Sequence, residues 1–148
     1  MTISFNADRV REPARWTQIG FLAIAVLFNI CLVAQLLAVG LAIFQNPVWW
    51  NTHVWLGRGF GVLGAILLLW VFLEAFPRKI RMLTVSLTVL LTLQFLTIHL
   101  NRFLPLGIFH PFIGFSLFTV STTLVHHSWR MVFPKLNAAI ANELNTLP

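Results

Sequence analysis

Three of the five histidines, His53, His99 and His110, lie at the ends of apolar segments. A neutral imidazole nitrogen can ligate a metal ion or a haem iron. His53 and His110 each stand four residues before a glycine, in the stretches HVWLG and HPFIG. Arg58 follows the first stretch inside an apolar segment, where a charge is costly and points to function by default. Imidazoles, glycines and an arginine in this setting are typical of a cofactor site.

The composition decides which class of protein must position these residues. The chain has 148 residues, of which 58% are hydrophobic and 9% are charged, and its mean hydropathy is +0.84. A soluble domain carries about 25% charged residues. The single cysteine, Cys31, excludes a disulfide framework, and no CxxCH motif offers an attachment site for c-type haem. We therefore expect one integral membrane domain over residues 1–148.

Four apolar segments are separated by short breakers that contain proline or basic residues. The segments cover residues 17–44, 53–76, 82–101 and 108–129. Each is near the length of about 20 residues that a helix needs to cross the hydrocarbon core. The first run is far longer than the apolar region of a cleavable signal peptide. Short connections favour antiparallel neighbours, so the expected fold is all-α, an up-down four-helix bundle in the membrane.

The basic residues predict the orientation of this bundle. Eight lie on one side: Arg9, Arg11, Arg15, Arg78, Lys79, Arg81, Arg130 and Lys135. Two lie on the other side: Arg58 and Arg102. By the positive-inside rule both termini, as short tails, are cytoplasmic. The charges are split among membrane-flanking segments, so they do not form a nucleic-acid surface. We expect a protein of the bacterial inner membrane, with lipid as its surroundings.

Helical spacing predicts which way the histidines point. His53, Gly57, Gly61 and Gly64 share one stripe, and His110, Gly114 and Ser121 share another. On the third segment the stripe consists of Thr84, Thr88, Thr92 and His99. Small and hydroxyl-bearing residues belong at helix interfaces in membranes, so all three histidines are expected to face inward at the outer end. Ordinary helix packing explains the glycines and threonines equally well.

In an up-down bundle the second and fourth helices are diagonal, so His53 and His110 can face each other across a planar cofactor. A glycine one turn below each histidine leaves room for a porphyrin, and the two arginines can pair with its propionates. The candidate cofactor-binding residues are His53, His110, His99, Arg58, Gly57, Gly61, Gly114 and Arg102. We expect one haem b per chain, because the adjacent His126 and His127 point about 100° apart and cannot clamp a second iron.

Several alternatives remain open at this stage. Counted from the inner basic residues, His53 lies roughly 7 Å higher than His110, so His99 with His110 is a second candidate ligand pair. Arg58 alternatively extends to the lipid headgroups, and Arg102 lies in a loop where it is simply solvated. The repeated His-x3-Gly motif is either a weak duplication of the two halves or a chance match.

The arrangement resembles one half of the haem A synthase family. Each half of that family is a four-helix bundle with haem-ligating histidines at the outer ends of its second and fourth helices, positions that His53 and His110 match here. The family has a glutamate three residues before the first histidine and an arginine directly after it, where this chain has Trp50 and Val54. The resemblance thus implies a haem-binding bundle without the family's oxidation activity. The chain also resembles small uncharacterised bacterial four-helix membrane proteins.

These observations favour a bis-histidine b-type haem protein that carries electrons, or that serves as an accessory subunit of a membrane redox complex. The expected partners are the other subunits of such a complex, or further copies of the chain in a homo-oligomer. On this interpretation the chain is not itself an enzyme. One alternative is a structural or assembly subunit without a cofactor. The other is a zinc or copper site, for which His53, His110 and His99 are the candidate metal ligands. No methionine, cysteine or carboxylate near them completes such a set.

Overall fold

The computed structural model describes residues 13–134 and contains four long helices and one short one. The helices are α1 (Arg15–Phe44), α2 (Trp49–Leu73), α3 (Arg78–Leu100), the 3₁₀ helix η1 (Leu106–Phe109) and α4 (His110–Val132). No strand occurs within residues 13–134. The expected all-α class and the four helices are therefore confirmed. The two tails, with Arg9, Arg11 and Lys135, lie outside the described residues.

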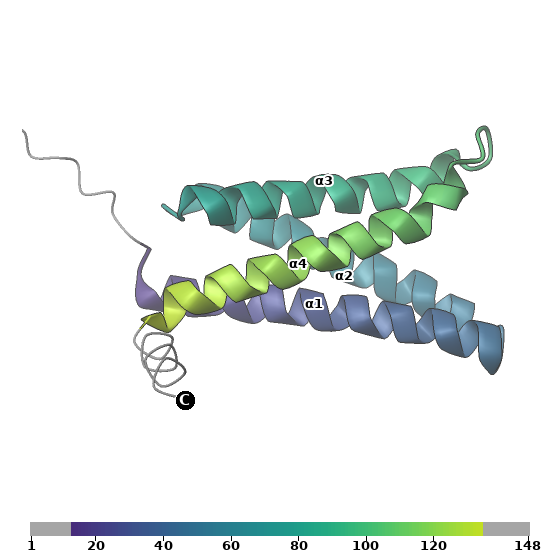
Figure 1. Cartoon of the computed structure of the whole chain (residues 1–148), viewed down its shortest axis with the longest axis horizontal. Helices are drawn as coiled ribbons and strands as arrows, with labels where there is room; N and C mark the ends of the chain where they lie inside the picture. The colour runs from purple at the N-terminus through teal and green to yellow at the C-terminus, as the bar shows by residue number, and fades with distance from the viewer. Residues whose placement is uncertain (1–12, 135–148) are drawn as a thin grey trace, which may run out of the picture.

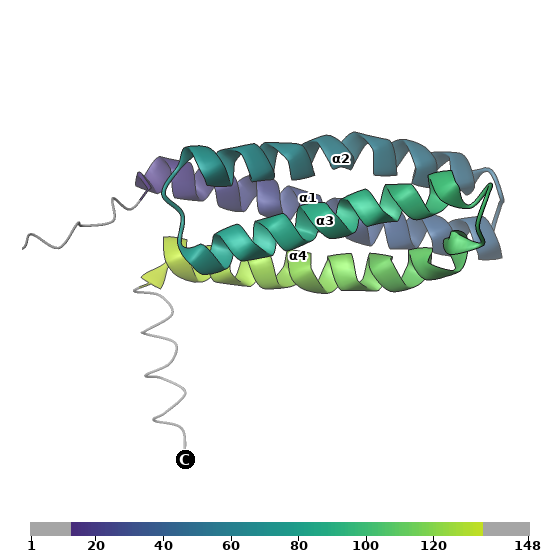
Figure 2. The same cartoon turned by 90° about the horizontal axis from the view of Figure 1, so that it is seen from above.

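Consecutive helices run in opposite directions, as an up-down bundle requires. Figures 1 and 2 show α1 and α3 running one way, and α2 and α4 running back between them. Helix α1 packs against α2 and α4, and α3 packs against the same two helices. The backbones of α2 and α4 do not contact each other, so these two helices are the expected diagonal pair.

The helix boundaries differ from the sequence-based ranges because the prolines lie beside helix starts. The amide of Val48 donates to the side chain of Asn46 at 2.9 Å, and α2 begins at once afterwards, four residues before His53. Helix α3 begins directly after Pro77, whose fixed φ suits a helix start. The basic residues of the expected loop therefore lie in the first turn of α3, and not between helices.

The apolar core fills the middle of the bundle and the end at which α1 starts. Phe21, Phe28, Leu67, Leu87 and Leu124 are all fully buried there. The ring of Phe21 packs against Phe76 in the α2–α3 loop, with 4.6 Å between centroids. The outer faces are also apolar: Leu36, Val62, Leu69 and Phe72 are each at least 60% exposed. Four helices within residues 13–134 are long and apolar enough to span a membrane.

Candidate functional site

The structure brings His53 and His110 together at the end of the bundle opposite the start of α1. His53 lies in the second turn of α2, and His110 is the first residue of α4. Their ring centroids are 6.3 Å apart, with 67° between the ring planes. The two rings thus bridge the diagonal between helices whose backbones do not touch. The 7 Å height difference expected from residue counting does not apply to the rings, because their centroids are only 6.3 Å apart in total.

Each of these two rings is anchored to the main chain of the preceding helix. Nδ1 of His53 lies 3.4 Å from the carbonyl oxygen of Gln35 in α1. Nδ1 of His110 lies 3.2 Å from the carbonyl oxygen of Gln94 in α3. A carbonyl only accepts hydrogen bonds, so Nδ1 carries a proton in both rings, and in the neutral form of each ring Nε2 is the nitrogen with a lone pair. Metal-ligating histidines are commonly held by such a bond at the second ring nitrogen.

The side chains of the same two glutamines lie at the neighbouring glycines. A Cβ atom built on Gly57 would come within 2.6 Å of Nε2 of Gln35, and one on Gly114 within 3.3 Å of Nε2 of Gln94. Nε2 of Gln94 also donates to Nε2 of His110 at 3.0 Å. The glycines therefore make room for two carboxamides, which pack where the sequence predicted a porphyrin.

The side-chain carbonyl oxygens of Gln35 and Gln94 are both buried and accept no hydrogen bond. Leaving a buried acceptor unsatisfied costs about 1–3 kcal/mol, so a folded protein rarely keeps two in one place without a reason. Neither glutamine was among the residues predicted for the site. The available signal was their position, 18 residues before His53 and 16 residues before His110, each the lone glutamine in the outer half of its helix.

The two halves of the chain thus build the same local arrangement twice. In each half, the main-chain carbonyl of a glutamine on the first helix accepts a hydrogen bond from a histidine on the second helix. The side chain of the same glutamine packs beside the glycine that lies one turn after that histidine. The residues are Gln35, His53 and Gly57 in the first half, and Gln94, His110 and Gly114 in the second. This agreement in contacts supports the interpretation of the His-x3-Gly motif as a duplication.

His99 does not join the pair, and the expectation that it faces inward was wrong. It is exposed, and its Nδ1 donates to the carbonyl of Phe95 in its own helix at 2.8 Å. Residues spaced by four advance about 40° per step around a helix. The threonine stripe therefore drifts from the buried Thr84 to the exposed Thr92, and carries His99 to the surface.

Three other residues predicted for the site, Arg58, Arg102 and Gly61, lie away from the contact between the two histidines. The exposed guanidinium of Arg58 lies 5.4 Å from the ring centroid of Trp55, one turn earlier on α2. Arg102 is exposed in the turn that follows α3. Gly61 faces Phe95 of α3, whose ring atoms would lie 3.4 and 3.5 Å from an added Cβ atom. None of these three residues contributes to the contact between His53 and His110.

The spacing of the two rings can be compared with that of two imidazoles on one metal. Two imidazoles bound to opposite sides of one metal, each through a bond of about 2 Å, have centroids roughly 6–6.5 Å apart. The observed spacing of 6.3 Å agrees with that figure. Within residues 13–134 no three or more His, Cys, Asp or Glu side chains gather closely enough to hold a metal ion.

Comparison with known proteins gives one match. No curated protein and no solved structure matches the chain. The model of a family of unknown function (DUF6220) matches residues 35–99, less than half of the chain. The matched stretch begins at Gln35, includes His53, Gly57 and Gln94, and ends at His99. Over these residues, which contain the first half of the site and the anchor of the second, the chain is similar to the DUF6220 family.

Proposed function

We propose that this chain is a membrane-embedded b-type haem protein that binds one haem through Nε2 of His53 and Nε2 of His110. The observation that carries the proposal is the contact between two imidazoles on diagonal helices, each held at Nδ1 by a main-chain carbonyl. Bound haem would supply one-electron chemistry, so the chain would carry electrons or serve as an accessory subunit of a membrane redox complex.

The topology is part of the same proposal. With basic residues gathered where α1 and α3 start, we infer from the positive-inside rule that this end and both termini are cytoplasmic. The histidine pair would then lie near the outer face of a bacterial inner membrane. Arg58 and Arg102 are the cations at this end, and we assign them to the haem propionates. For that role Arg58 must leave the ring of Trp55.

The residues present fit a haem in their donor chemistry, and one of them must move. Nε2 of His110 accepts a hydrogen bond from Gln94, so it can ligate iron only when that carboxamide turns away. The space beside Gly57 and Gly114 is occupied by the ends of the Gln35 and Gln94 side chains, and not by backbone. Each carboxamide can therefore turn away without a movement of the main chain. Because the oxygens of both carboxamides are unpaired, this movement breaks only the hydrogen bond from Gln94 to His110.

The optical spectrum tests this proposal. The protein, expressed with added haem precursor and purified in detergent, should show a Soret band and the sharp α band of six-coordinate low-spin haem after reduction. A reduced-minus-oxidised spectrum without these bands, even after incubation with free haem, would contradict the proposal. Binding that survives only as a broad high-spin band would contradict the assignment of two histidine ligands.

A structural role without a cofactor is the second candidate, and one observation favours it. Both ring nitrogens of His110 already have partners within the chain, both supplied by Gln94. In that case Gln94→Leu removes a useful hydrogen bond, and the free energy of unfolding falls by about 1 kcal/mol. If haem binds, Gln94→Leu instead frees Nε2 of His110 and tightens haem binding severalfold. Gln35→Leu is the matched control, because its carboxamide donates no hydrogen bond to a histidine.

A further inference from the structure

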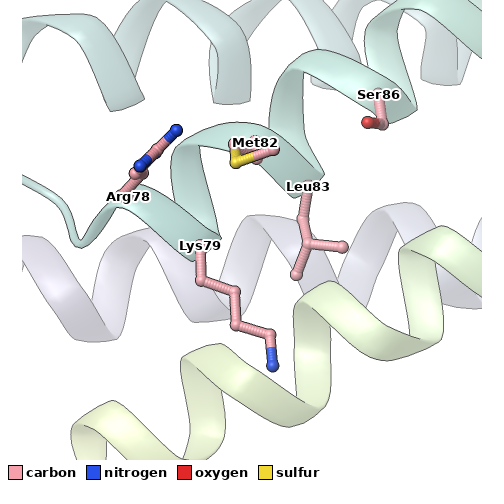
Figure 3. Close-up of a pocket in the computed structure, with 5 residues that line it drawn as sticks. All are labelled: Arg78, Lys79, Met82, Leu83 and Ser86. Carbon is pink, nitrogen blue, oxygen red and sulfur yellow. The ribbon is translucent and has the colours of Figure 1, made fainter.

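A second feature lies at the opposite end of the bundle, beside the first two turns of α3. A groove of about 550 Å³ is lined by Arg78, Lys79, Met82, Leu83 and Ser86. These residues follow one face of the helix. Figure 3 shows Lys79 reaching from α3 toward α4, with Leu83 above it and Arg78 at the start of the helix. The groove is therefore cationic at the start of α3 and apolar one turn further along the helix.

The charges around this groove are almost all positive. Five cations of the described part lie at this end of the bundle: Arg15, Arg78, Lys79, Arg81 and Arg130. Glu74 is the one carboxylate within residues 13–134. Lys79 lies close enough to His127 of α4 to interact with it electrostatically, and so do Arg130 and His126. The chain thus concentrates like charges that repel one another, and an anion between them would relieve the repulsion.

The start of α3 adds to this positive potential. No side chain caps the helix, whose first turn contains no acidic residue. The free N–H groups of an uncapped helix start carry a partial positive charge that favours an anion. They act here together with two lining cations and a groove of molecular size, so the helix start is not the sole basis for a site.

We propose that this groove binds an anionic phospholipid. Its phosphate would meet Arg78 and Lys79, and its glycerol and acyl chains would lie along Ser86, Met82 and Leu83. The apolar lining favours a lipid over free phosphate, because inorganic phosphate has nothing to place against Met82, which is 58% exposed. Basic residues of a membrane-spanning helix near the membrane face are a common feature of headgroup sites, and here all the lining residues belong to α3. The proposal does not depend on haem, since the histidine pair lies at the other end.

Native mass spectrometry tests the proposal on the full chain in detergent with added phosphatidylglycerol or phosphatidylcholine. The double variant Arg78→Gln/Lys79→Gln removes both lining cations. Its matched control, Arg15→Gln/Arg81→Gln, removes two exposed cations from the same end that do not line the groove. We expect the unmodified chain to retain phosphatidylglycerol in preference. The lining variant should bind it about tenfold or more weakly, and the control should change less than about twofold.

Other results would overturn the proposal. An equal loss in both double variants would mean that the overall surface charge attracts the lipid, without a defined groove. Equal retention of phosphatidylcholine by the unmodified chain would remove the role of the anion. Inorganic phosphate that displaces phosphatidylglycerol completely at low millimolar concentration would assign the site to free phosphate. The charge-conserving Arg78→Lys/Lys79→Arg variant should bind as the unmodified chain does, and its failure to bind would also count against the proposal.

Discussion

The two ends of this bundle differ in what fills the space between the helices. At the end where α1 starts, Phe21 packs against Phe76, Leu67, Leu87 and Leu124 are fully buried, and the buried polar side chains, Thr84 and Ser128, are small hydroxyls. At the other end the corresponding space holds His53, His110 and two glutamine side chains, two of whose atoms are buried and unpaired. Apolar side chains dominate the first end, where the hydroxyl of Ser128 is buried and unpaired. The second end gives up apolar contact for imidazole and carboxamide groups, and this is the pattern expected of a binding site.

The largest expected effect comes from removing the histidines of the pair. His53→Ala and His110→Ala should each abolish the low-spin haem spectrum, because each removes one of the two proposed haem ligands. His99→Ala is the matched control at the same end, and it should leave the spectrum unchanged since His99 is exposed and bonds to its own helix. Loss of haem in His99→Ala with retention in His53→Ala would break the assignment.

The second largest effect should come from the apolar end. Leu124→Ala removes a fully buried side chain, and we expect the free energy of unfolding to fall by about 2–4 kcal/mol, with unchanged haem content per folded chain. Leu69→Ala, at a side chain that is 62% exposed, is the control and should cost much less. Detergent-induced unfolding measures both variants. Similar losses from the two would mean that the apolar end is not the stable part of the bundle.

A smaller effect is expected at the glycines of the histidine end. Gly57→Val places a branched side chain where Nε2 of Gln35 lies, whereas nothing lies within 4 Å of a Cβ atom at Gly59. Overpacking of this kind costs about 1–3 kcal/mol. Gly57→Val should therefore lower both the free energy of unfolding and the haem content, and Gly59→Val should change neither. Thermal unfolding and haem titration measure both quantities in the two variants. Equal stability and equal haem content in Gly57→Val and Gly59→Val would show that haem binding does not require the glycine at position 57.

The smallest effect is expected from Arg58. Arg58→Leu removes a cation near the proposed haem but no ligand, so haem should remain bound. Its midpoint potential should fall slightly, because a nearby positive charge favours the reduced iron. Arg58→Lys should recover part of the change, since it restores the charge without the planar guanidinium. An unchanged potential in redox titration of Arg58→Leu would show that the arginine serves only its contact with Trp55.

The helices and the diagonal pair could be predicted from the sequence because they follow from short-range rules. Apolar length and short connections predict antiparallel helices, and the order of helices in an up-down bundle places α2 opposite α4. His53 and His110 are thereby predicted to lie on diagonal helices at the same end, while these rules do not predict their relative height. The structure starts α3 at Arg78, earlier than the predicted start at Met82. In the sequence, Pro77 and the basic residues after it indicate a loop, whereas in the structure Pro77 directly precedes the helix.

The glutamines and the position of His99 could not be predicted in the same way. The contact of Gln35 with His53 depends on how far α1 slides along α2, and spacing within one helix carries no information on that sliding. The stripe from Thr84 to His99 looks continuous only if its drift around the helix is ignored. Over that distance the drift moves the stripe from the core to the surface.

The haem-to-chain ratio tests the central claim most directly. We expect the pyridine haemochrome assay on the purified protein to give about one haem b per chain, because the described part of the bundle offers one histidine pair across its diagonal. The His53→Ala/His110→Ala double variant, purified in parallel and shown to keep its helical content, should give none. A ratio near two, or a ratio that the double variant leaves unchanged, would contradict the assignment of a single haem to His53 and His110.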